Sequence, residues 1–272
     1  MRKLFGKLMA VALVVTMMCG LVACGSNEET KEESTKKMDK IVLGTSADYP
    51  PFEFIILDEN KKQQYTGIDI SLAQQIAKDM GVELEIVNMN FDNLIASLQK
   101  GDVDMVISGV EKDGKREKVV DFSEAYYTDL PPMVLIKADK KDTYKDAKSL
   151  EGKTIAAQSG STKADIVKKD FKKSKLLALT SVTDIVNNLA YDKCDAVVLD
   201  GAVAQQYAQE NDDMVIADIE LGAEVPYFVA VQKDDPKGVL NDINKTIKNA
   251  IEKKLVDKWI EEADAKSDEA VE

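Results

Sequence analysis

Apolar residues recur with helical spacing in several parts of the chain. Ile68, Leu72 and Ile76 follow one another at four-residue intervals, which places them on one face of an amphipathic helix that Gly81 ends as a C-cap. Trp259 takes a similar place on a C-terminal stripe, where a core anchor is the simplest interpretation. Helices are therefore predicted over Ile68–Met80, Phe91–Gln99 and Val239–Ala263.

Short apolar runs, many of them β-branched, lie between the helical segments and are typical of buried strands. The predicted strands are Lys40–Gly44, Leu84–Val87, Asp104–Ser108, Thr154–Ala157, Ala196–Leu199 and Met214–Ile216. Because these strands alternate with helices, the pattern favours an α/β fold built on parallel sheets.

Two stretches of the sequence, Leu98–Gly109 and Leu189–Asp200, share one order of features. Each reads as a helix end, a turn, a buried strand and a residue at the carboxyl end of that strand. Ligands of open α/β sheets bind beyond such ends, so the repeat predicts two lobes with Gly109 and Asp200 on facing cleft walls. Any two α–β units would look similar, however, so the repeat alone does not decide for a cleft.

Residues 1–23 have the pattern of a secretory signal, with three basic residues followed by an apolar run shorter than a spanning helix requires. Leu21–Gly25 resembles the bacterial lipoprotein signal, which implies cleavage before Cys24 and its lipidation by acyl chains such as palmitate. A plain signal cleaved after Ala23 and an uncleaved anchor are the alternatives. Residues 24–39 are polar and read as a tether.

The composition is globular and excludes several kinds of site. Of the 272 residues, 44% are hydrophobic and 31% charged, with a net charge of -13. This charge argues against nucleic acid as a partner, because phosphate binding requires a basic surface. The chain has no histidine, which excludes Ser–His–Asp and Cys–His catalysis and His-ligated metals, and we expect no metal or cofactor. Cys194 is expected to be a buried, inert thiol.

Six motifs occur in one order along residues 40–260. They are Thr45–Phe54 (TSADYPPFEF), Thr66–Ile70 (TGIDI), Arg116–Ser123 (REKVVDFS) with Tyr126 and Tyr127, Lys153–Ile155 with Gln158–Thr162 (QSGST), Asp195–Asp200 (DAVVLD), and Lys254–Trp259 (KLVDKW). In this order they resemble the polar amino-acid-binding family of extracytoplasmic solute-binding proteins.

The resemblance implies a two-lobe periplasmic-binding-protein-like fold of type II, with two crossing hinge strands near Tyr126–Leu130 and Pro226–Ala230. Lobe 1 would comprise residues 40–128 and 228–272, and lobe 2 residues 129–227. It further implies that the lobes close on a small amino acid or close analogue and dock on the membrane permease of an ABC importer. We expect an extracytoplasmic monomer, anchored to the cell membrane by lipid.

A buried amino acid needs partners for its carboxylate and its ammonium. Arg116 offers a planar fork for the carboxylate, and the resemblance favours this role over a surface salt bridge with Glu117 or Asp121. Ser161 and Thr162 follow a glycine in a strand–loop–helix context, where hydroxyls and backbone N–H groups favour an anion. Either residue could instead be only an N-cap, and the two roles are compatible.

For the solute's ammonium, the resemblance implies Asp200. The alternative is that Asp200 only caps the helix predicted to begin near Ala202. The carbonyl of Ser108 or Val110, on either side of Gly109, would help to accept the ammonium protons.

Four other positions set the expected walls of the cleft. Tyr49 should provide a flat apolar wall, because bound side chains in this family rest against an aromatic residue there; the alternative is an ordinary loop aromatic. Ile68 makes the opposite wall aliphatic where many members have an aromatic residue. Ser46 replaces an acid that members for basic ligands often carry, which weakens the case for lysine or arginine. Gln158 could face the solute's side chain and favour a neutral polar group.

Glu111 departs most clearly from the family pattern, in which a Ser or Thr donates to the ligand's carboxylate at this position. An ionised Glu only accepts hydrogen bonds and would repel that carboxylate. It either points to solvent beside Lys112 or receives a cationic or donor group, and we favour solvent because charged residues are rarely buried unpaired. The departure weakens the assignment to α-amino acids more than the assignment to small solutes.

Two other function classes stay open at this point. Some relatives of this fold are dehydratases or lyases, and Glu111 is the one expected cleft carboxylate besides Asp200 that could serve as an acid or base. A ligand-sensing surface lipoprotein without a transport role is the other alternative. We favour a binding protein that is not an enzyme.

Overall fold

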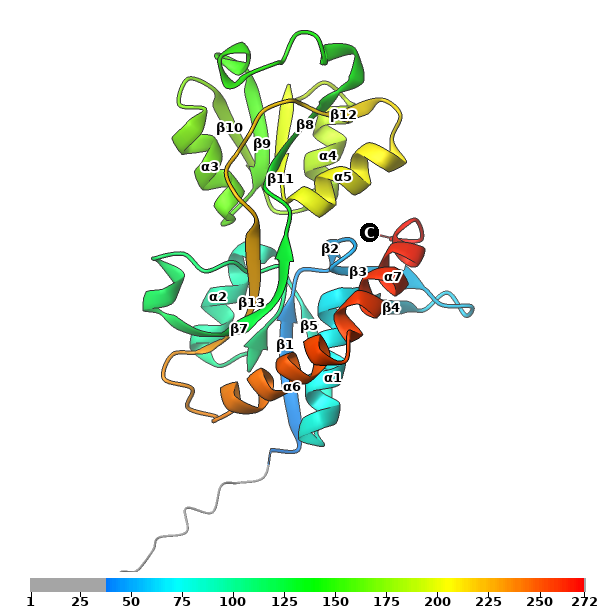
Figure 1. The fold of residues 1–272 in the computed structure, drawn as a ribbon, viewed down its shortest axis with the longest axis vertical. Helices are drawn as coiled ribbons and strands as arrows, with labels where there is room; N and C mark the ends of the chain where they lie inside the picture. Colours follow the sequence, from blue (N-terminus) through cyan, green and yellow to red (C-terminus); the bar gives the residue numbers. More distant parts are fainter. Residues whose placement is uncertain (1–37, 272) are drawn as a thin grey trace, which may run out of the picture. The chain divides into compact units, whose positions relative to one another are not determined.

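The computed structural model describes residues 38–271, which form two α/β lobes, each built on a five-stranded sheet (Figure 1). The secretory signal, the lipidation site at Cys24 and residues 24–37 of the expected tether lie outside the described residues.

The first lobe contains the sheet with strand order β5-β1-β6-β13-β7. Its strands are β5 (Glu83–Asn88), β1 (Lys40–Thr45), β6 (Met105–Val106), β13 (Val225–Gln232) and β7 (Val120–Asp129). Strand β1 runs parallel to β5 and β6, as expected for strands joined through helical crossovers, whereas β13 is antiparallel to β6 and β7.

Strand β6 is shorter than the predicted Asp104–Ser108, because side chains take over hydrogen bonds at both ends. The carboxylate of Asp104 accepts the backbone N–H of Val42 at 2.9 Å, and the hydroxyl of Ser108 accepts the backbone N–H of Ser46 at 3.1 Å. The second of these bonds leaves Ser108 in a loop beside the cleft.

A small sheet and two helices complete the N-terminal half of the first lobe. They are β2 (Asp48–Tyr49), β3 (Glu53–Leu57), β4 (Gln63–Thr66), α1 (Ile68–Met80) and α2 (Phe91–Lys100), and a 3₁₀ turn, η1, follows at Arg116–Lys118. Helix α1 begins and ends where the hydrophobic pattern predicts, with Gly81 in the left-handed conformation at its C-cap. Gly67, at φ 118°, precedes the helix, and a Cβ there would collide with the Phe52 carbonyl.

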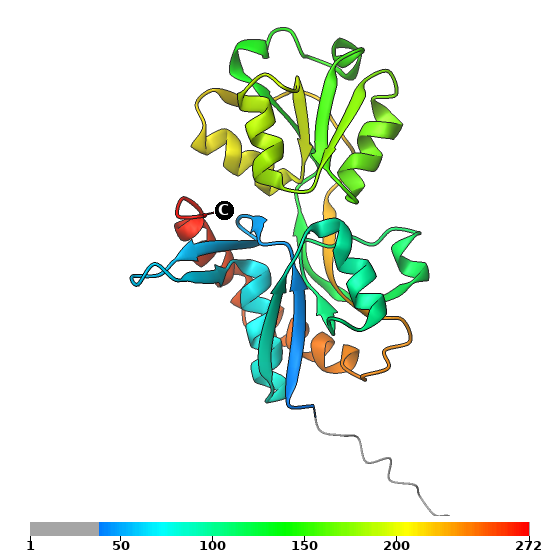
Figure 2. The ribbon, with the colours of Figure 1, turned by 180° about the vertical axis from the view of Figure 1, so that it is seen from behind.

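The second lobe contains the sheet with strand order β10-β9-β11-β8-β12. Its elements are β8 (Met133–Lys137), η2 (Ala138–Lys140), η3 (Ala147–Leu150), β9 (Thr154–Gln158), α3 (Thr162–Asp170), β10 (Lys175–Leu179), α4 (Val182–Ala190), β11 (Ala196–Leu199), α5 (Gly201–Glu210) and β12 (Met214–Ile216). Alternate residues of β11 point to opposite faces: Val197 and Leu199 pack with α4 and α5, and Ala196 and Val198 pack with α3. Figure 2 shows the second lobe from behind, with helices on both faces of its sheet.

Strands β7 and β13 join the two lobes. They pair in antiparallel register, from Val225 opposite Asp129 to Gln232 opposite Val120. The chain passes from β7 into β8 of the second lobe and returns from β12 into β13 (Figure 1). These strands span the predicted crossings, and the predicted two-lobe fold is confirmed. The residue boundaries of the lobes given above stay a prediction.

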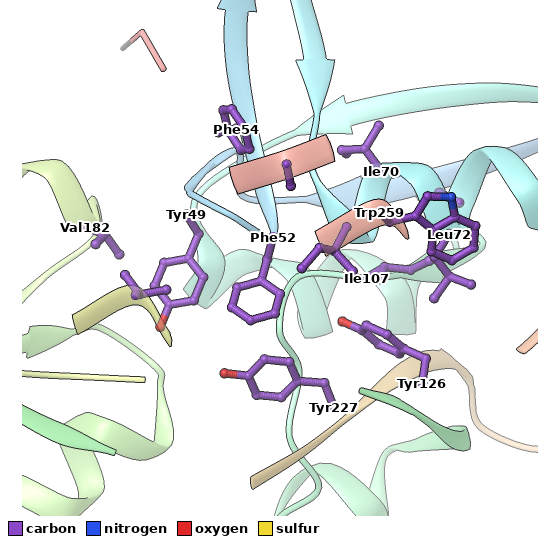
Figure 3. Packing of buried hydrophobic residues seen from close by; sticks show 14 of the residues in the cluster. Tyr49, Phe52, Phe54, Ile70, Leu72, Ile107, Tyr126, Val182, Tyr227 and Trp259 are labelled. Carbon is purple, nitrogen blue, oxygen red and sulfur yellow. The ribbon is translucent and has the colours of Figure 1, made fainter. Parts of the chain in front are cut away.

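Aromatic rings form the part of the core nearest the hinge (Figure 3). The Phe52 ring lies edge-on to Tyr127 and Tyr227, with centroids 5.2 and 5.1 Å apart. Trp259 belongs to the same buried cluster, as predicted. Cys194 is also buried, and this burial, together with the charge of Asp195, raises the pKa of its thiol to about 12.

The C-terminal segment forms two helices, α6 (Leu240–Glu252) and α7 (Leu255–Ser267), where one helix over Val239–Ala263 was predicted. The prediction was wrong because Lys254 adopts a left-handed conformation, with φ 54°, which ends the helical hydrogen-bond ladder. The hydrophobic stripe runs across this break and so does not reveal it.

Candidate functional site

Loops that follow the strands of both sheets meet between the lobes and enclose a narrow cavity of about 10 Å³. This is the position expected for a ligand site in open α/β sheets. The cavity is lined by Ser46, Tyr49, Glu53, Phe91, Ser108, Gly109, Gln158, Ser161, Lys163 and Asp200. Both lobes contribute, and seven of these residues are among those predicted from the sequence: Ser46, Tyr49, Ser108, Gly109, Gln158, Ser161 and Asp200.

Tyr49 forms the side of the cavity that belongs to the first lobe. Its ring is buried and stacks on Phe52 with centroids 6.1 Å apart (Figure 3). Its hydroxyl donates a short hydrogen bond to Oδ2 of Asp200 in the second lobe. Tyr49 is therefore both an aromatic wall and a direct contact between the lobes.

A buried acid pair supports the floor of the cavity. Asp69 accepts the backbone N–H of Gly109 at 2.8 Å and the hydroxyl of Tyr126 at 2.7 Å, and burial raises its pKa to about 6. Glu53 accepts a short hydrogen bond from Ser108, while burial and the charge of Asp69 raise its pKa well above the usual range. Its burial and the neighbouring carboxylate of Asp69 therefore both disfavour the charged form of Glu53.

Four charged side chains form a buried chain between the lobes. The guanidinium of Arg116 donates to the carbonyl of Glu111 at 2.9 Å. Lys163 Nζ donates to the carboxylate of Glu111 over a short distance and to Oδ1 of Asp200 at 2.6 Å. Relative exposure is 9% or less for all four residues. Burial alone would lower the pKa of Lys163, but the charges of Asp200 and Glu111 outweigh it and raise the pKa.

The expectation that Glu111 points to solvent was wrong. Its carboxylate lies in the cleft and accepts hydrogen bonds from Lys163 Nζ and, at 2.8 Å, from the hydroxyl of Thr162. This is the alternative in which Glu111 receives a cationic group. Lys163 was missed altogether, although its place one residue after Thr162, in the first turn of α3, is a signal that could have pointed to the site.

Arg116 is buried but directed mainly at groups of the protein. Its second terminal nitrogen donates to the carbonyl of Gly160 in the other lobe at 3.1 Å, and Nε lies 3.3 Å from the carboxylate of Asp113. The guanidinium lies 5.4 Å from the centre of the Phe91 ring. Arg116 lines a groove that adjoins the cavity and shares Phe91 and Ser161 with it. Its ion-pair partner is Asp113, not the Glu117 or Asp121 considered from the sequence.

The start of α3 brings two of the predicted hydroxyls to the site. Ser161 is the N-cap of the helix and accepts the backbone N–H of Ala164 at 3.3 Å, while its hydroxyl donates to the carbonyl of Gln158 at 2.7 Å. The Thr162 side chain points to Glu111, as described above. Gln158 donates its amide to the carbonyl of Thr180 at 3.3 Å.

The side chain of Asp200 does not cap α5, which excludes the alternative role considered for it. Asp129, at the end of hinge strand β7, accepts the backbone N–H of Ala202 at 3.2 Å instead. Asp129 also accepts the hydroxyl of Tyr227 at 2.9 Å. Asp200 is therefore free to face the cleft, because another carboxylate holds the start of its helix.

Five predicted residues do not line the cavity: Glu111, Arg116 and Thr162 lie beside it, as described above, and Ile68 and Val110 take other positions. Ile68 packs in the core of the first lobe, at 1% exposure, and lines a separate hollow with Tyr127 and Leu130. The side chain of Val110 packs with Leu94, and its carbonyl accepts the backbone N–H of Phe228 at 2.9 Å. Within residues 38–271, no His, Cys, Asp and Glu side chains are grouped so that they could hold a metal ion.

Residues 41–262 match the family model of the bacterial extracellular solute-binding proteins, family 3. The chain is 34% identical over 265 residues to the arginine-binding extracellular protein ArtP of Bacillus subtilis, covering 93% of this chain and 96% of ArtP.

Among solved structures, the chain resembles the amino acid ABC transporter substrate-binding protein AbpA of Streptococcus pneumoniae bound to L-arginine. The TM-score is 0.79 at 36% identity, over 84% of this chain and 95% of that chain. It also resembles the ancestral amino acid-binding protein AncCDT-1, a precursor of cyclohexadienyl dehydratase, with a TM-score of 0.73 at 33% identity, over 82% and 94% of the two chains. None of the helices between residues 38 and 271 has the length and apolar character needed to cross a bilayer.

Proposed function

Because the chain belongs to the bacterial extracellular solute-binding proteins, family 3, we propose that it binds a small amino acid or close analogue outside the cell and delivers it to an ABC import permease. The observation that carries the proposal is the set of four buried charged side chains, two from each lobe, that meet beside one cavity. Charged groups of both signs are what a zwitterionic solute requires when it leaves water.

In this proposal, Arg116 holds the carboxylate of the solute. Two of its nitrogens donate to neutral backbone carbonyls, so a carboxylate that replaces one of them would gain charge-assisted hydrogen bonds. Ser161 and Thr162 line the same groove at the start of α3, where backbone N–H groups would add donors; their hydroxyls would add more by exchanging their bonds to Gln158 and Glu111 for bonds to the solute.

Asp200 holds the ammonium on the other side, at 2% exposure, with the carbonyl of Ser108 as a further acceptor. Tyr49 provides the aromatic wall and positions Asp200 through its hydroxyl. A solute that contacts Asp200 and Arg116 together stabilises the closed arrangement of the lobes only through its higher affinity for that arrangement.

The experiment is a thermal-shift panel of the twenty amino acids and common opines on the purified full chain, followed by titration calorimetry. A solute present at 100 times its Kd should stabilise the protein by about 2.7 kcal/mol. Arg116→Gln should lose this shift, whereas Lys118→Gln, an exposed lysine two residues later, should keep it. A flat panel would overturn the proposal.

Uptake of the labelled solute by cells with and without this protein then separates import from sensing. Loss of uptake without the protein supports delivery to a permease, and binding with unchanged uptake indicates a sensor. Recovery of the solute unaltered after incubation excludes turnover, and its conversion would indicate an enzyme instead.

We also propose that Cys24 carries the lipid anchor, on the sequence signal described above. Cells that express the protein and are fed labelled palmitate should label the wild type and leave Cys24→Ser unlabelled and released from the membrane. An unlabelled, membrane-free wild type would contradict the anchor while leaving the solute-binding proposal intact.

A further inference from the structure

We propose that Lys163 determines the solute specificity of this site. Its ammonium pairs with the two buried carboxylates of the cleft, Glu111 and Asp200, so the site favours solutes with uncharged polar side chains over basic ones. The inference rests on the proposed function and narrows its substrate class. It differs from a direct transfer of ligand from ArtP or AbpA, whose names and bound ligand specify arginine.

The first step of the argument is the position of Lys163. Its side chain is 7% exposed and extends from the first turn of α3 to the boundary between the lobes. There its ammonium contacts Glu111 of the first lobe and Asp200 of the second lobe. A lysine is seldom buried unless it is paired, and here both partners are buried carboxylates.

The second step is the charge of the cleft. Glu111 and Asp200 are acidic, and Arg116 and Lys163 are basic, so these four buried groups sum to zero. A zwitterionic solute with a neutral side chain leaves this balance unchanged. The solute's own ammonium would share Asp200 with Lys163. An additional cationic group would then find no further carboxylate among the four and would be repelled by the ammonium of Lys163 at close range.

The third step concerns the other groups that line the cavity. Glu53 is the one further carboxyl group among them, and its burial beside Asp69 raises its pKa and disfavours its charged form. The other polar lining groups include the hydroxyls of Ser46 and Ser108 and the amide of Gln158, all of which are uncharged hydrogen-bonding groups. They suit a polar side chain such as an amide or a hydroxyl.

Two further carboxylates lie close to the site but are engaged elsewhere. Asp48 accepts the backbone N–H of Val182 at 2.8 Å, and burial raises its pKa. Asp113 pairs with Nε of Arg116 and is 31% exposed. Neither contacts Lys163, and the two carboxylates that do contact it are Glu111 and Asp200.

The test is titration calorimetry of arginine, glutamine and glutamate against the full chain and its variants. Lys163→Gln leaves a net charge of -1 in the cleft, and the ratio of arginine to glutamine affinity should rise about tenfold or more. The double variant Glu111→Gln/Lys163→Gln restores a net charge of zero in the cleft and should lose most of the rise in that ratio. This comparison separates the effect of the charge of Lys163 from the effect of its side-chain size. Lys168→Gln removes a largely exposed charge from the same helix and should match the wild type.

If Lys163→Gln does not fold, Glu111→Gln tests the same idea in the opposite direction. The cleft then has a net charge of +1, and glutamate should gain affinity relative to arginine. A wild type that binds arginine more tightly than any neutral amino acid, or ratios that no variant changes, would overturn the inference while the proposed function stands. Absence of binding by every amino acid in every folded variant would overturn both.

Discussion

The buried carboxylate of Asp129 predicts a pH-dependent stability that one substitution should abolish. It lies at the end of hinge strand β7 at 1% exposure and accepts hydrogen bonds from the backbone N–H groups of Leu130, at 2.8 Å, and Ala202, at 3.2 Å. Burial, reinforced by the charge of Asp200, raises its pKa from 3.8 to about 6. The hydrogen bonds only partly offset this cost of ionisation.

The magnitude follows from the difference between the folded and unfolded pKa values. Each pKa unit corresponds to about 1.4 kcal/mol, so a difference of about two units is worth about 3 kcal/mol. Because the folded pKa is the higher one, this stability is fully present below pH 3.8 and is lost as the pH rises through 6. An asparagine does not ionise in either state, so Asp129→Asn should remove this dependence.

The assay is urea denaturation of the wild type and Asp129→Asn at pH 4 and pH 7. The free energy of unfolding of the wild type relative to the variant should fall by about 2 kcal/mol between the two pH values, because part of the roughly 3 kcal/mol is already lost at pH 4. Asp212→Asn, which changes an exposed aspartate, should leave the pH dependence of the wild type unchanged. A wild-type-to-variant difference that stays constant across this range would refute the reasoning.

Two further substitutions test the supports of the site. A Cβ at Gly201 would lie 2.5 Å from the side chain of Leu130, so Gly201→Ala should lower the free energy of unfolding by about 1–3 kcal/mol in urea denaturation. Gly114→Ala, where a Cβ would meet open space, should not lower it. Equal stabilities of the two variants would show that the backbone around Gly201 shifts without cost. Tyr49→Phe removes the hydrogen bond to Asp200 but keeps the aromatic ring, so calorimetry should show an affinity for the solute about tenfold lower than that of the wild type. An unchanged affinity would contradict a positioning role for the hydroxyl.

The two-lobe fold could be predicted because its signals are local. Helix α1 combines an apolar stripe with a terminal glycine, and the strands are short apolar runs, so each element is visible within a few residues. The break between α6 and α7 was missed because it depends on the backbone conformation of Lys254, a residue without a turn signal. The shortened strand β6 was missed because the competing hydrogen bonds of Asp104 and Ser108 are tertiary contacts.

The site residues that belong to a recognisable motif could be predicted from the sequence. The contacts between residues of different motifs could not, because they form only in the folded protein. Asp200, Arg116 and Tyr49 were singled out through motifs, and all three are buried between the lobes. Glu111 was misplaced because its partner, Lys163, is 52 residues away along the chain. Each is a charged residue that would ordinarily lie in solvent, and only the fold brings them together.

The most direct test of the central claim is calorimetric titration of the best solute, its methyl ester and its deaminated analogue against the wild type, Arg116→Gln and Asp200→Asn. The wild type should bind the ester and the deaminated analogue about 100-fold more weakly than the intact solute. Arg116→Gln should no longer distinguish acid from ester, and Asp200→Asn should no longer distinguish the solute from its deaminated form. If both variants keep the full discrimination of the wild type, the solute's charges are held by other groups.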